Sequence, residues 1–330
     1  MARINSSIKR SNLYPMEKIK IVVAGIGGVG GYFGGVLSKH YFNHPCIEII
    51  FLARGEHLQK IQSVGLKVIK GETEFIARPS LATNNPNEIG EADLVLICTK
   101  TYDLEKALQE LCPCITDKTI LLPLLNGVNN MQKIQQLFPN NLVLDGCVYL
   151  VSRRTEPGVI ENFGNIQSLY FGKDNYAHEK LSQLLRIFKD AGIEAQTSTQ
   201  ISSIIWEKFI FLSPTATATS FYNENIGEVI NNPAHFADFV ALIEEIKQVA
   251  EAKQIVLPKD LTEKTIQKFR SLPATATSSM HADFKHQTAS NELHSVTGYV
   301  LEEAANFNIH LPVYAHMFEE LKSKLNPLSK

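Results

Sequence analysis

A glycine-rich loop between a short apolar strand and a helix is the feature that most constrains this fold. The run IKIVVAG, residues 19–25, is apolar and β-branched, which is typical of a buried strand. The loop that follows fits the pattern G-x-G-x-x-G and consists of Gly25, Ile26, Gly27, Gly28, Val29 and Gly30. The pattern alone is weak, but a strand before it and a helix after it are what a dinucleotide-binding βαβ unit requires. The alternative is a glycine-rich turn without a ligand.

Three of these glycines have distinct expected roles. Gly25 permits a tight turn, Gly27 lets the backbone approach a pyrophosphate, and Gly30 lets helix and strand pack closely. Free N–H groups at the start of the helix, together with the helix dipole, favour a bound anion.

Strands and helices alternate up to about residue 198, which predicts right-handed crossovers and a parallel sheet. Strands are expected over 47–54, 92–100 and 119–127, and helices over 55–64, 103–111 and 131–138. A few more strands follow residue 140, then a helix over 178–192 and a last strand over 193–198.

From about residue 199 the pattern is helical. Apolar residues between Phe236 and Val249 recur at helical spacing, and further helices are expected over 259–271, 288–307 and 312–325. A chain of 330 residues suits two domains. The sequence therefore predicts an α/β Rossmann-type dinucleotide-binding domain over 18–198, followed by an all-α helical domain over 199–330. Residues 1–17 are expected to be a disordered extension, unless translation starts at Met16.

Composition narrows the class of protein. Net charge is −2 and the basic residues are scattered, which argues against nucleic acid as a partner. The polar start lacks the apolar core of a signal peptide, and no run approaches the roughly 18 apolar residues of a membrane span. Five cysteines lack metal-ligand spacing, so we expect no metal site, and a reducing cytoplasm is the simplest setting.

The residue that ends the second strand indicates which dinucleotide binds. NAD enzymes usually have Asp or Glu there for the ribose hydroxyls, whereas Arg suits the 2′-phosphate of NADP. This chain has Arg54, whose guanidinium fits phosphate in a bidentate way. The sequence therefore predicts NADP(H), with an exposed surface arginine as the alternative. Glu56 leaves room for some use of NAD, since it could reach a ribose hydroxyl.

Two polar residues follow later strands. Lys100 comes after LVLICT, and Asn126 after ILLPLL. In open α/β sheets ligands bind beyond the carboxyl ends of the strands, so both residues are well placed for cofactor or substrate. The alternatives are an exposed loop lysine and a simple Asn-Gly turn.

One lysine interrupts an apolar helical face in the second part of the chain. Ile204, Lys208, Phe211 and Thr215 recur at helical spacing. Hydride delivery to a ketone leaves negative charge on oxygen, and a cationic acid beside it typically contributes about 10²–10⁴-fold in rate. Partial desolvation would lower the pKa of Lys208 toward working pH. The alternative is a lysine whose stem covers apolar surface while its ammonium reaches water.

The chain resembles the ketopantoate reductases (2-dehydropantoate 2-reductases) from residue 18 to about 325. The order and spacing of the matching elements carry the resemblance. They are GIGGVG, Arg54, Thr99-Lys100, Asn126-Gly127, Trp206-Glu207-Lys208, Ser278-Ser279-Met280 with Asp283, and Glu292 ahead of Thr297-Gly298.

The resemblance implies a role for each candidate residue. The implied cofactor-binding residues are Gly25 to Gly30, Arg54, Lys100, Asn126, Ser152 and Glu292. The implied substrate-binding residues are Asn126, Ser279 and Lys208, with Ser279 on the carboxylate and Lys208 as general acid. Two alternatives stay open: Ser278 and Ser279 could only cap a helix, and Glu292 could be an exposed helix residue.

One departure from the family pattern concerns the substrate. Better-known members carry asparagines four and eight residues after the lysine, where this chain has Leu212 and Ala216. Ser213, Thr215 or Thr217 could substitute for those amides. A site that hydrogen-bonds a substrate hydroxyl rejects poorly matched analogues strongly, so the departure bears on ketopantoate itself rather than on the reaction class.

The resemblance implies NADPH-dependent reduction of ketopantoate to (R)-pantoate in pantothenate and coenzyme A biosynthesis, by a monomer or homodimer. Two alternatives remain. The first is a related NADPH-dependent reductase of another small keto acid, and the second is an NADP-binding regulator without turnover.

Overall fold

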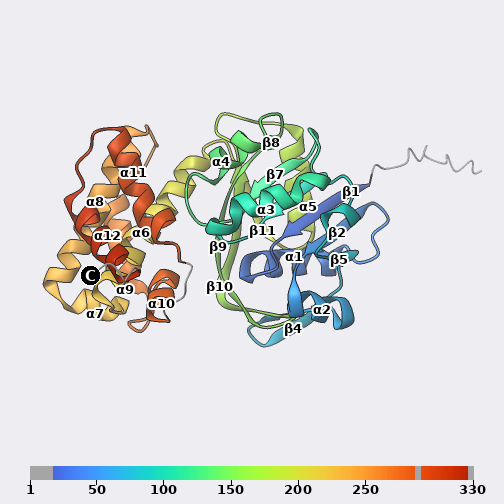
Figure 1. The fold of residues 1–330 in the computed structure, drawn as a ribbon, viewed down its shortest axis with the longest axis horizontal. Coiled ribbons are helices and arrows are strands. Elements are labelled where there is room, and N and C mark those ends of the chain that lie inside the picture. The colour runs from blue at the N-terminus through green and yellow to red at the C-terminus, as the bar shows by residue number, and fades with distance from the viewer. Residues whose placement is uncertain (1–17, 287–290, 326–330) are drawn as a thin grey trace, which may run out of the picture.

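The computed structural model describes residues 18–286 and 291–325. It contains an α/β part with two sheets and a helical part, joined where β11 (Glu194–Ser198) gives way to α6 (Ile201–Tyr222), as Figure 1 shows. The predicted fold class is confirmed. The predicted boundary between 198 and 199 lies between these two elements and stays a prediction, while the expected extension over 1–17 lies outside the described residues.

The first sheet is parallel throughout, with strand order β5-β2-β1-β6-β7-β8. Its strands are β1 (Ile19–Ala24), β2 (Ile47–Leu52), β5 (Leu81–Thr83), β6 (Leu94–Ile97), β7 (Ile120–Pro123) and β8 (Leu142–Val143). Successive side chains of β1 point to opposite faces, so Ile21 and Val23 enter one core while Val22 and Ala24 enter another. Both faces of the sheet are therefore covered, which explains why the strands read as continuous apolar runs.

Four helices of the α/β part begin and end close to the predicted bounds, and a fifth begins at the glycine loop. They are α1 (Gly28–His40), α2 (Gly55–Val64), α3 (Leu104–Leu111), α4 (Asn130–Leu137) and α5 (Glu179–Asp190). Apolar residues of α3 and α4 pack on one face of the first sheet, and those of α1, α2 and α5 join the core on its other face. Short 3₁₀ turns span Pro86–Glu88, Thr101–Asp103 and Cys112–Cys114.

A second, mixed sheet was not predicted as such. It is built around β10 (Val159–Gly172), which is long enough to pair with two strands in succession along one side. Its other strands are β3 (Leu66–Lys70), β4 (Thr73–Ala77), β9 (Asp145–Glu156) and β11. The antiparallel β3–β4 hairpin was missed, because only three of its ten strand residues are buried and no buried apolar run marks it.

Helix α1 lies between the two sheets, and its glycines make this possible. A Cβ at Gly34 would stand 3.0 Å from Phe51 of the first sheet, and one at Gly31 would stand 2.5 Å from Ile160 of the second. Without side chains at these positions the helix approaches both sheets closely. The glycine-rich sequence after the loop therefore serves packing as well as the loop itself.

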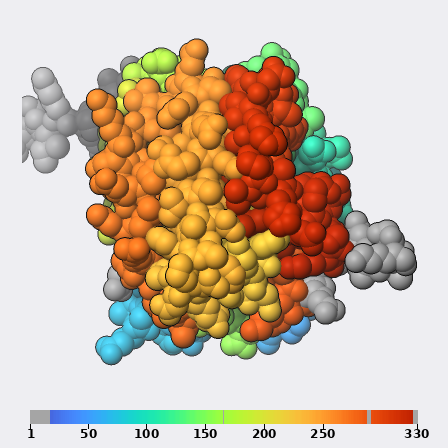
Figure 2. All heavy atoms as spheres, turned by 90° about the vertical axis from the view of Figure 1, so that its left-hand side faces the viewer, coloured from blue at the N-terminus to red at the C-terminus, as the bar shows by residue number. Residues whose placement is uncertain are grey.

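The helical part is organised around α6. Its other helices are α7 (Ile226–Asn231), α8 (Pro233–Ala252), α9 (Leu261–Ser271), α10 (Ser279–Lys285), α11 (Tyr299–Asn306) and α12 (Pro312–Leu325). Figure 2 shows this part from outside, with the C-terminal helices in red beside the golden surface of the earlier ones. The predicted helix over 288–307 is only partly right: residues 288–290 lie outside the described residues, and a π-helical turn over His294–Gly298 precedes α11.

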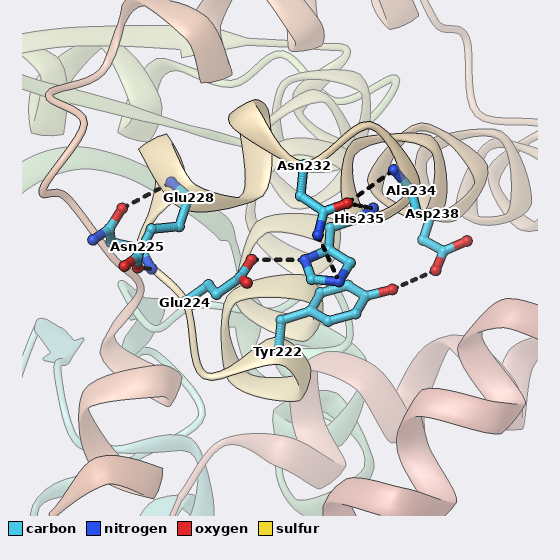
Figure 3. A network of polar contacts seen from close by, with 8 residues as sticks. All are labelled: Tyr222, Glu224, Asn225, Glu228, Asn232, Ala234, His235 and Asp238. Carbon is cyan, nitrogen blue, oxygen red and sulfur yellow. Dashed lines mark hydrogen bonds and ion pairs between the residues drawn. The ribbon is translucent and has the colours of Figure 1, made fainter.

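Polar contacts join the end of α6 to the start of α8, with α7 between them in the chain (Figure 3). Tyr222, the last residue of α6, donates to Asp238, and its ring stacks on His235 at 3.5 Å between centroids. His235 also pairs with Glu224 at 2.8 Å, and Asn232 caps the start of α8. These contacts fix the direction in which α8 returns along α6, and thereby hold α6 in place.

Candidate functional site

A cavity of about 830 Å³ lies at the carboxyl ends of β1, β2, β6 and β7 and continues to α6 and the segment around α10. This is the position expected for a ligand of an open α/β sheet. Of the predicted site residues, all but Gly30 line it. They are Gly25, Ile26, Gly27, Gly28, Val29, Arg54, Lys100, Asn126, Ser152, Lys208, Ser279 and Glu292.

The three singled-out glycines differ in what surrounds them. Gly25 has a φ of +94°, the left-handed region that favours glycine. A Cβ at Gly30 would stand 2.1 Å from the carbonyl oxygen of Gly25, so Gly30 serves helix–strand packing, as expected. At Gly27, by contrast, an added Cβ would meet nothing within 4 Å among the described residues. The space beside Gly27 is open toward the cavity, at the start of α1 where N–H groups favour an anion.

Three buried hydroxyls of the cavity wall lack a hydrogen-bond partner within the described part of the chain. They belong to Thr99, Thr101 and Ser152. Buried polar groups normally have partners, and an orphaned one costs about 1–3 kcal/mol. A ligand rich in phosphate and ribose oxygens would supply partners to several such groups at once. This wall therefore fits a dinucleotide.

Several cations line the cavity. Lys100, Lys106, Arg153 and Arg154 line it together with Arg54, whose guanidinium forms an ion pair with Glu110. Such a cluster attracts an anionic ligand and raises its local concentration.

Lys208 reaches across from α6 to the α/β part. Its ammonium donates to Asn126 Oδ1 at 3.0 Å and to the carbonyl oxygen of Val148 at 2.8 Å. Burial lowers the pKa of Lys208, while the thiol of Cys147 and the carboxylate of Glu292 oppose this shift. An ammonium has three N–H bonds, and within the described residues two of them have partners, so one remains for a ligand in the cavity. Lys208 is therefore held by both parts of the molecule and is not a lysine directed into solvent.

Ser278 and Ser279 have different positions in the structure, and Glu292 is buried at the cavity. Ser278 caps α10 by accepting from the backbone N–H of His281 at 3.0 Å, whereas Ser279 lines the cavity. Ser279 donates to Glu292 at 3.5 Å. The reading of Glu292 as an exposed helix residue is wrong, since the residue is only 5% exposed and lines the cavity.

A small hollow adjoins the cavity at Lys208 and Asn126, and its wall is mostly apolar. The other lining residues are Leu125, Gly127, Gly146, Cys147, Ile205, Phe209 and Leu212. Leu212 stands one turn after Lys208 on α6, the first of the two positions where the family pattern has asparagine. The second, Ala216, is buried in an apolar cluster with Met280 and Leu293.

The hydroxyls suggested as replacements for the missing amides have other partners. Ser213 bonds to Tyr314 and to the carbonyl oxygen of Val296, and Thr217 bonds to Thr297 at 2.8 Å. Thr215 donates to a carbonyl one turn earlier in α6. These hydroxyls join α6 to its neighbouring helices or to its own backbone, so the suggestion that they replace the amides is not supported.

Sequence reasoning missed several lining residues. His57, Thr101, Lys106 and Glu110 all line the cavity, yet none belongs to a motif. Glu56, which was considered as a residue that could reach a ribose hydroxyl, is exposed and lies outside the cavity lining as far as the chain is described. The acidic side chain beside Arg54 is Glu110, from α3, and a contact between segments so far apart in sequence carries no local signal.

Two further findings concern other ligands. In residues 18–286 and 291–325, no three His, Cys, Asp or Glu side chains come together as a metal site would need. Within the same described residues, every helix is too short or too polar to cross a bilayer.

A Rossmann part, a helical part and a lysine at their junction are the arrangement expected of an oxidoreductase that uses a nicotinamide dinucleotide. Comparison with known families then narrows the class. The model described as "Ketopantoate reductase PanE/ApbA" matches residues 21–175, and "Ketopantoate reductase PanE/ApbA C terminal" matches residues 200–325. The chain belongs to the ketopantoate reductase family, which confirms the resemblance inferred from sequence.

Similar proteins carry several names. A crystal structure of 2-dehydropantoate 2-reductase from Porphyromonas gingivalis W83 is 34% identical, with a TM-score of 0.82, covering 93% of this chain and 100% of that one. A 2-dehydropantoate 2-reductase of Halobacterium salinarum is 28% identical over 89% of this chain and 95% of its own length. An uncharacterized oxidoreductase of Bacillus subtilis, YkpB, is 26% identical over 92% of this chain and 98% of its own length.

The fold is not restricted to one named substrate. The ternary structure of D-mandelate dehydrogenase with NADH and anilino(oxo)acetate has a TM-score of 0.80, covering 94% of this chain and 100% of that one. At 22% identity this likeness shows the fold alone. The comparisons therefore place the chain in a family of NAD(P)H-dependent oxidoreductases.

Proposed function

We propose that this chain is an NADPH-dependent reductase of ketopantoate, forming (R)-pantoate for pantothenate biosynthesis, with Lys208 as its general acid. The observation that carries the proposal is the Lys208 ammonium, held by Asn126 and Val148 at one end of a cavity whose other end has the glycine loop and Arg54. Its family membership and the names of its relatives support the same reaction class.

The residues of the α/β part would bind the cofactor. In this proposal the loop from Gly25 to Gly30 holds the pyrophosphate, and Arg54 holds the 2′-phosphate. Lys100, Asn126 and Ser152 contact the cofactor as well, and Glu292 of the helical part holds its ribose or its amide. When bound, NADPH supplies a hydride to the keto carbon of the substrate.

The residues near α6 would bind the substrate and move the proton. Ser279 donates to the substrate carboxylate, and Lys208 donates to the keto oxygen. As negative charge develops on that oxygen, the ammonium stabilises it and transfers one proton, leaving a neutral amine that solvent reprotonates. A lowered pKa favours this transfer, because it makes the ammonium a stronger acid than an ordinary lysine.

A second candidate follows from the apolar hollow beside Lys208. The hollow holds only about 10 Å³, so a substrate side chain would have to widen it. Leu212 and its neighbours would then give that side chain apolar contact, and the nearby hydroxyls of α6 already have partners. An apolar wall does not reward the hydroxyl of ketopantoate, although it rejects an added hydroxyl by only about 10²-fold. A small 2-keto acid with an apolar side chain is therefore the alternative substrate.

One assay tests both candidates. The consumption of NADPH would be followed with ketopantoate and with trimethylpyruvate, which differ only by one hydroxyl. A higher kcat/KM for ketopantoate supports the first substrate, and a higher value for trimethylpyruvate supports the second. Tight binding of NADPH without turnover of any keto acid would contradict the proposed reaction and indicate a regulator.

A further inference from the structure

The ion pair between Arg54 and Glu110 joins two elements that flank the same end of the cavity. Arg54 directly precedes α2 at the end of β2, and Glu110 lies in the last turn of α3. Both residues line the cavity, so the pair is part of its wall. The arginine proposed to bind a 2′-phosphate thus already has an anion beside it.

Two observations indicate that a ligand can exchange for this anion. The side chains of Arg54 and Glu110 are 60% and 35% exposed, and ion pairs at such exposure contribute little to stability. A carboxylate in the last turn of a helix is also disfavoured by the helix dipole. Glu110 therefore depends on Arg54 for compensation but does not hold it strongly.

The charge of Glu110 affects the two dinucleotides in opposite directions. A 2′-phosphate carries close to two negative charges and would compete with the carboxylate for the same guanidinium, which weakens NADPH. A 2′-hydroxyl can donate a hydrogen bond to a carboxylate, so the carboxylate of Glu110 favours NADH. Lys106, one turn before Glu110 on α3 and also in the wall, adds a positive charge for either ligand.

We propose that Glu110 is the residue that sets the preference between NADPH and NADH, by competing with the 2′-phosphate for Arg54. The proposal rests on the cofactor role proposed for Arg54, and it is independent of which keto acid is reduced. It assigns to α3 a specificity role that the strand-end residue is usually thought to carry alone.

Binding of cofactor fragments tests this without any turnover. Calorimetry on the full chain would compare adenosine 2′,5′-bisphosphate with 5′-AMP, for wild type and for Glu110→Gln. Releasing the Arg54 guanidinium from a competing carboxylate leaves it free to bind the 2′-phosphate, which is expected to tighten the bisphosphate about five- to tenfold. The affinity for 5′-AMP is expected to stay the same or to weaken.

Glu105→Gln is the matched control. Glu105 is exposed on the same helix and lies outside the described cavity lining, so this variant has the same net charge as Glu110→Gln. Equal gains in both variants would mean that only net charge matters, and would overturn the proposal. Unchanged bisphosphate affinity in Glu110→Gln, with an intact unfolding transition, would overturn it too.

A double-mutant cycle separates this proposal from the proposed function. If Glu110 acts through Arg54, then Glu110→Gln loses its effect in an Arg54→Gln background. A persistent effect would show that Glu110 acts on the ligand by another route. Failure of keto-acid reduction, with this cycle intact, would refute the proposed reaction and leave the role of Glu110 standing.

Discussion

The two ends of the cavity differ in whether their polar groups already have hydrogen-bond partners within the protein. At the α/β end, Thr99, Thr101 and Ser152 have buried hydroxyls without partners in the described residues, and the space beside Gly27 is open. At the α6 end, Lys208 is already bonded to the α/β part, and the hydroxyls of Ser213 and Thr217 already have partners. The first end is shaped for a ligand that completes it, whereas the second holds a preassembled acid in an apolar setting. We therefore expect substitutions at the α/β end to change binding and those at the α6 end to change turnover or substrate choice.

The largest effect is expected from Lys208→Ala. Removing the proton donor and its positive charge is expected to lower kcat by at least about 10²-fold, because general acid catalysis typically contributes 10²–10⁴-fold. The affinity for NADPH should stay nearly unchanged, since the cofactor is proposed to lie mainly against the other end of the cavity. Steady-state kinetics at saturating keto acid measure kcat, and fluorescence titration with NADPH measures the affinity.

Lys264→Ala, which removes an exposed lysine of α9, is the control for Lys208→Ala. Turnover like that of wild type in Lys208→Ala would remove this lysine from the mechanism. A loss of NADPH affinity as large as the loss of kcat would break the proposed division between the two ends.

Arg54→Ala is expected to weaken cofactor binding, and to weaken NADPH more than NADH. Hydrogen bonds to charged groups contribute about 1.5–3 kcal/mol, so the Kd of NADPH is expected to rise roughly tenfold to a hundredfold. NADH lacks the 2′-phosphate and should lose far less. Equal losses for NADPH and NADH, measured by titration, would mean that Arg54 does not contact the 2′-phosphate.

How much of this could be predicted from sequence depended on whether the signal was local. The first sheet follows from apolar strands alternating with helices, and the residues that end β1, β2, β6 and β7 fall at the cavity because parallel strands share an edge. The second sheet depends on β10 pairing with strands far apart in sequence, which no local pattern reveals.

The site shows the same division. Lys208 stood out because a charge interrupts an apolar helical face, and its partners then followed from the fold. Glu110 did not stand out, because a glutamate on an amphipathic helix resembles any solvent-exposed one until α3 is placed beside Arg54. Ser213 and Thr217 were misjudged because spacing along α6 does not tell which neighbouring helix each hydroxyl meets.

Leu212→Asn tests whether the α6 end selects the substrate. An amide beside the hollow could hydrogen-bond the hydroxyl of ketopantoate, so the ratio of kcat/KM for ketopantoate over trimethylpyruvate is expected to rise about tenfold to a hundredfold. Leu212→Met conserves volume and apolar character, and should leave that ratio nearly unchanged. A ratio that moves equally in both variants would assign the effect to packing rather than to hydrogen bonding.

The smallest effects should come from paired substitutions in the glycine loop, which divide binding from folding within one motif. In Gly30→Ala the new Cβ would collide with the carbonyl of Gly25, so the free energy of unfolding is expected to fall by about 1–3 kcal/mol. In Gly27→Ala the Cβ enters open space, and the free energy of unfolding should fall by less than about 1 kcal/mol.

The Cβ of Gly27→Ala would occupy the space proposed for the pyrophosphate, so NADPH affinity should fall in this variant. Denaturant unfolding and NADPH titration of both variants check this. Wild-type NADPH affinity in Gly27→Ala would place the pyrophosphate elsewhere, because only a ligand could be obstructed there.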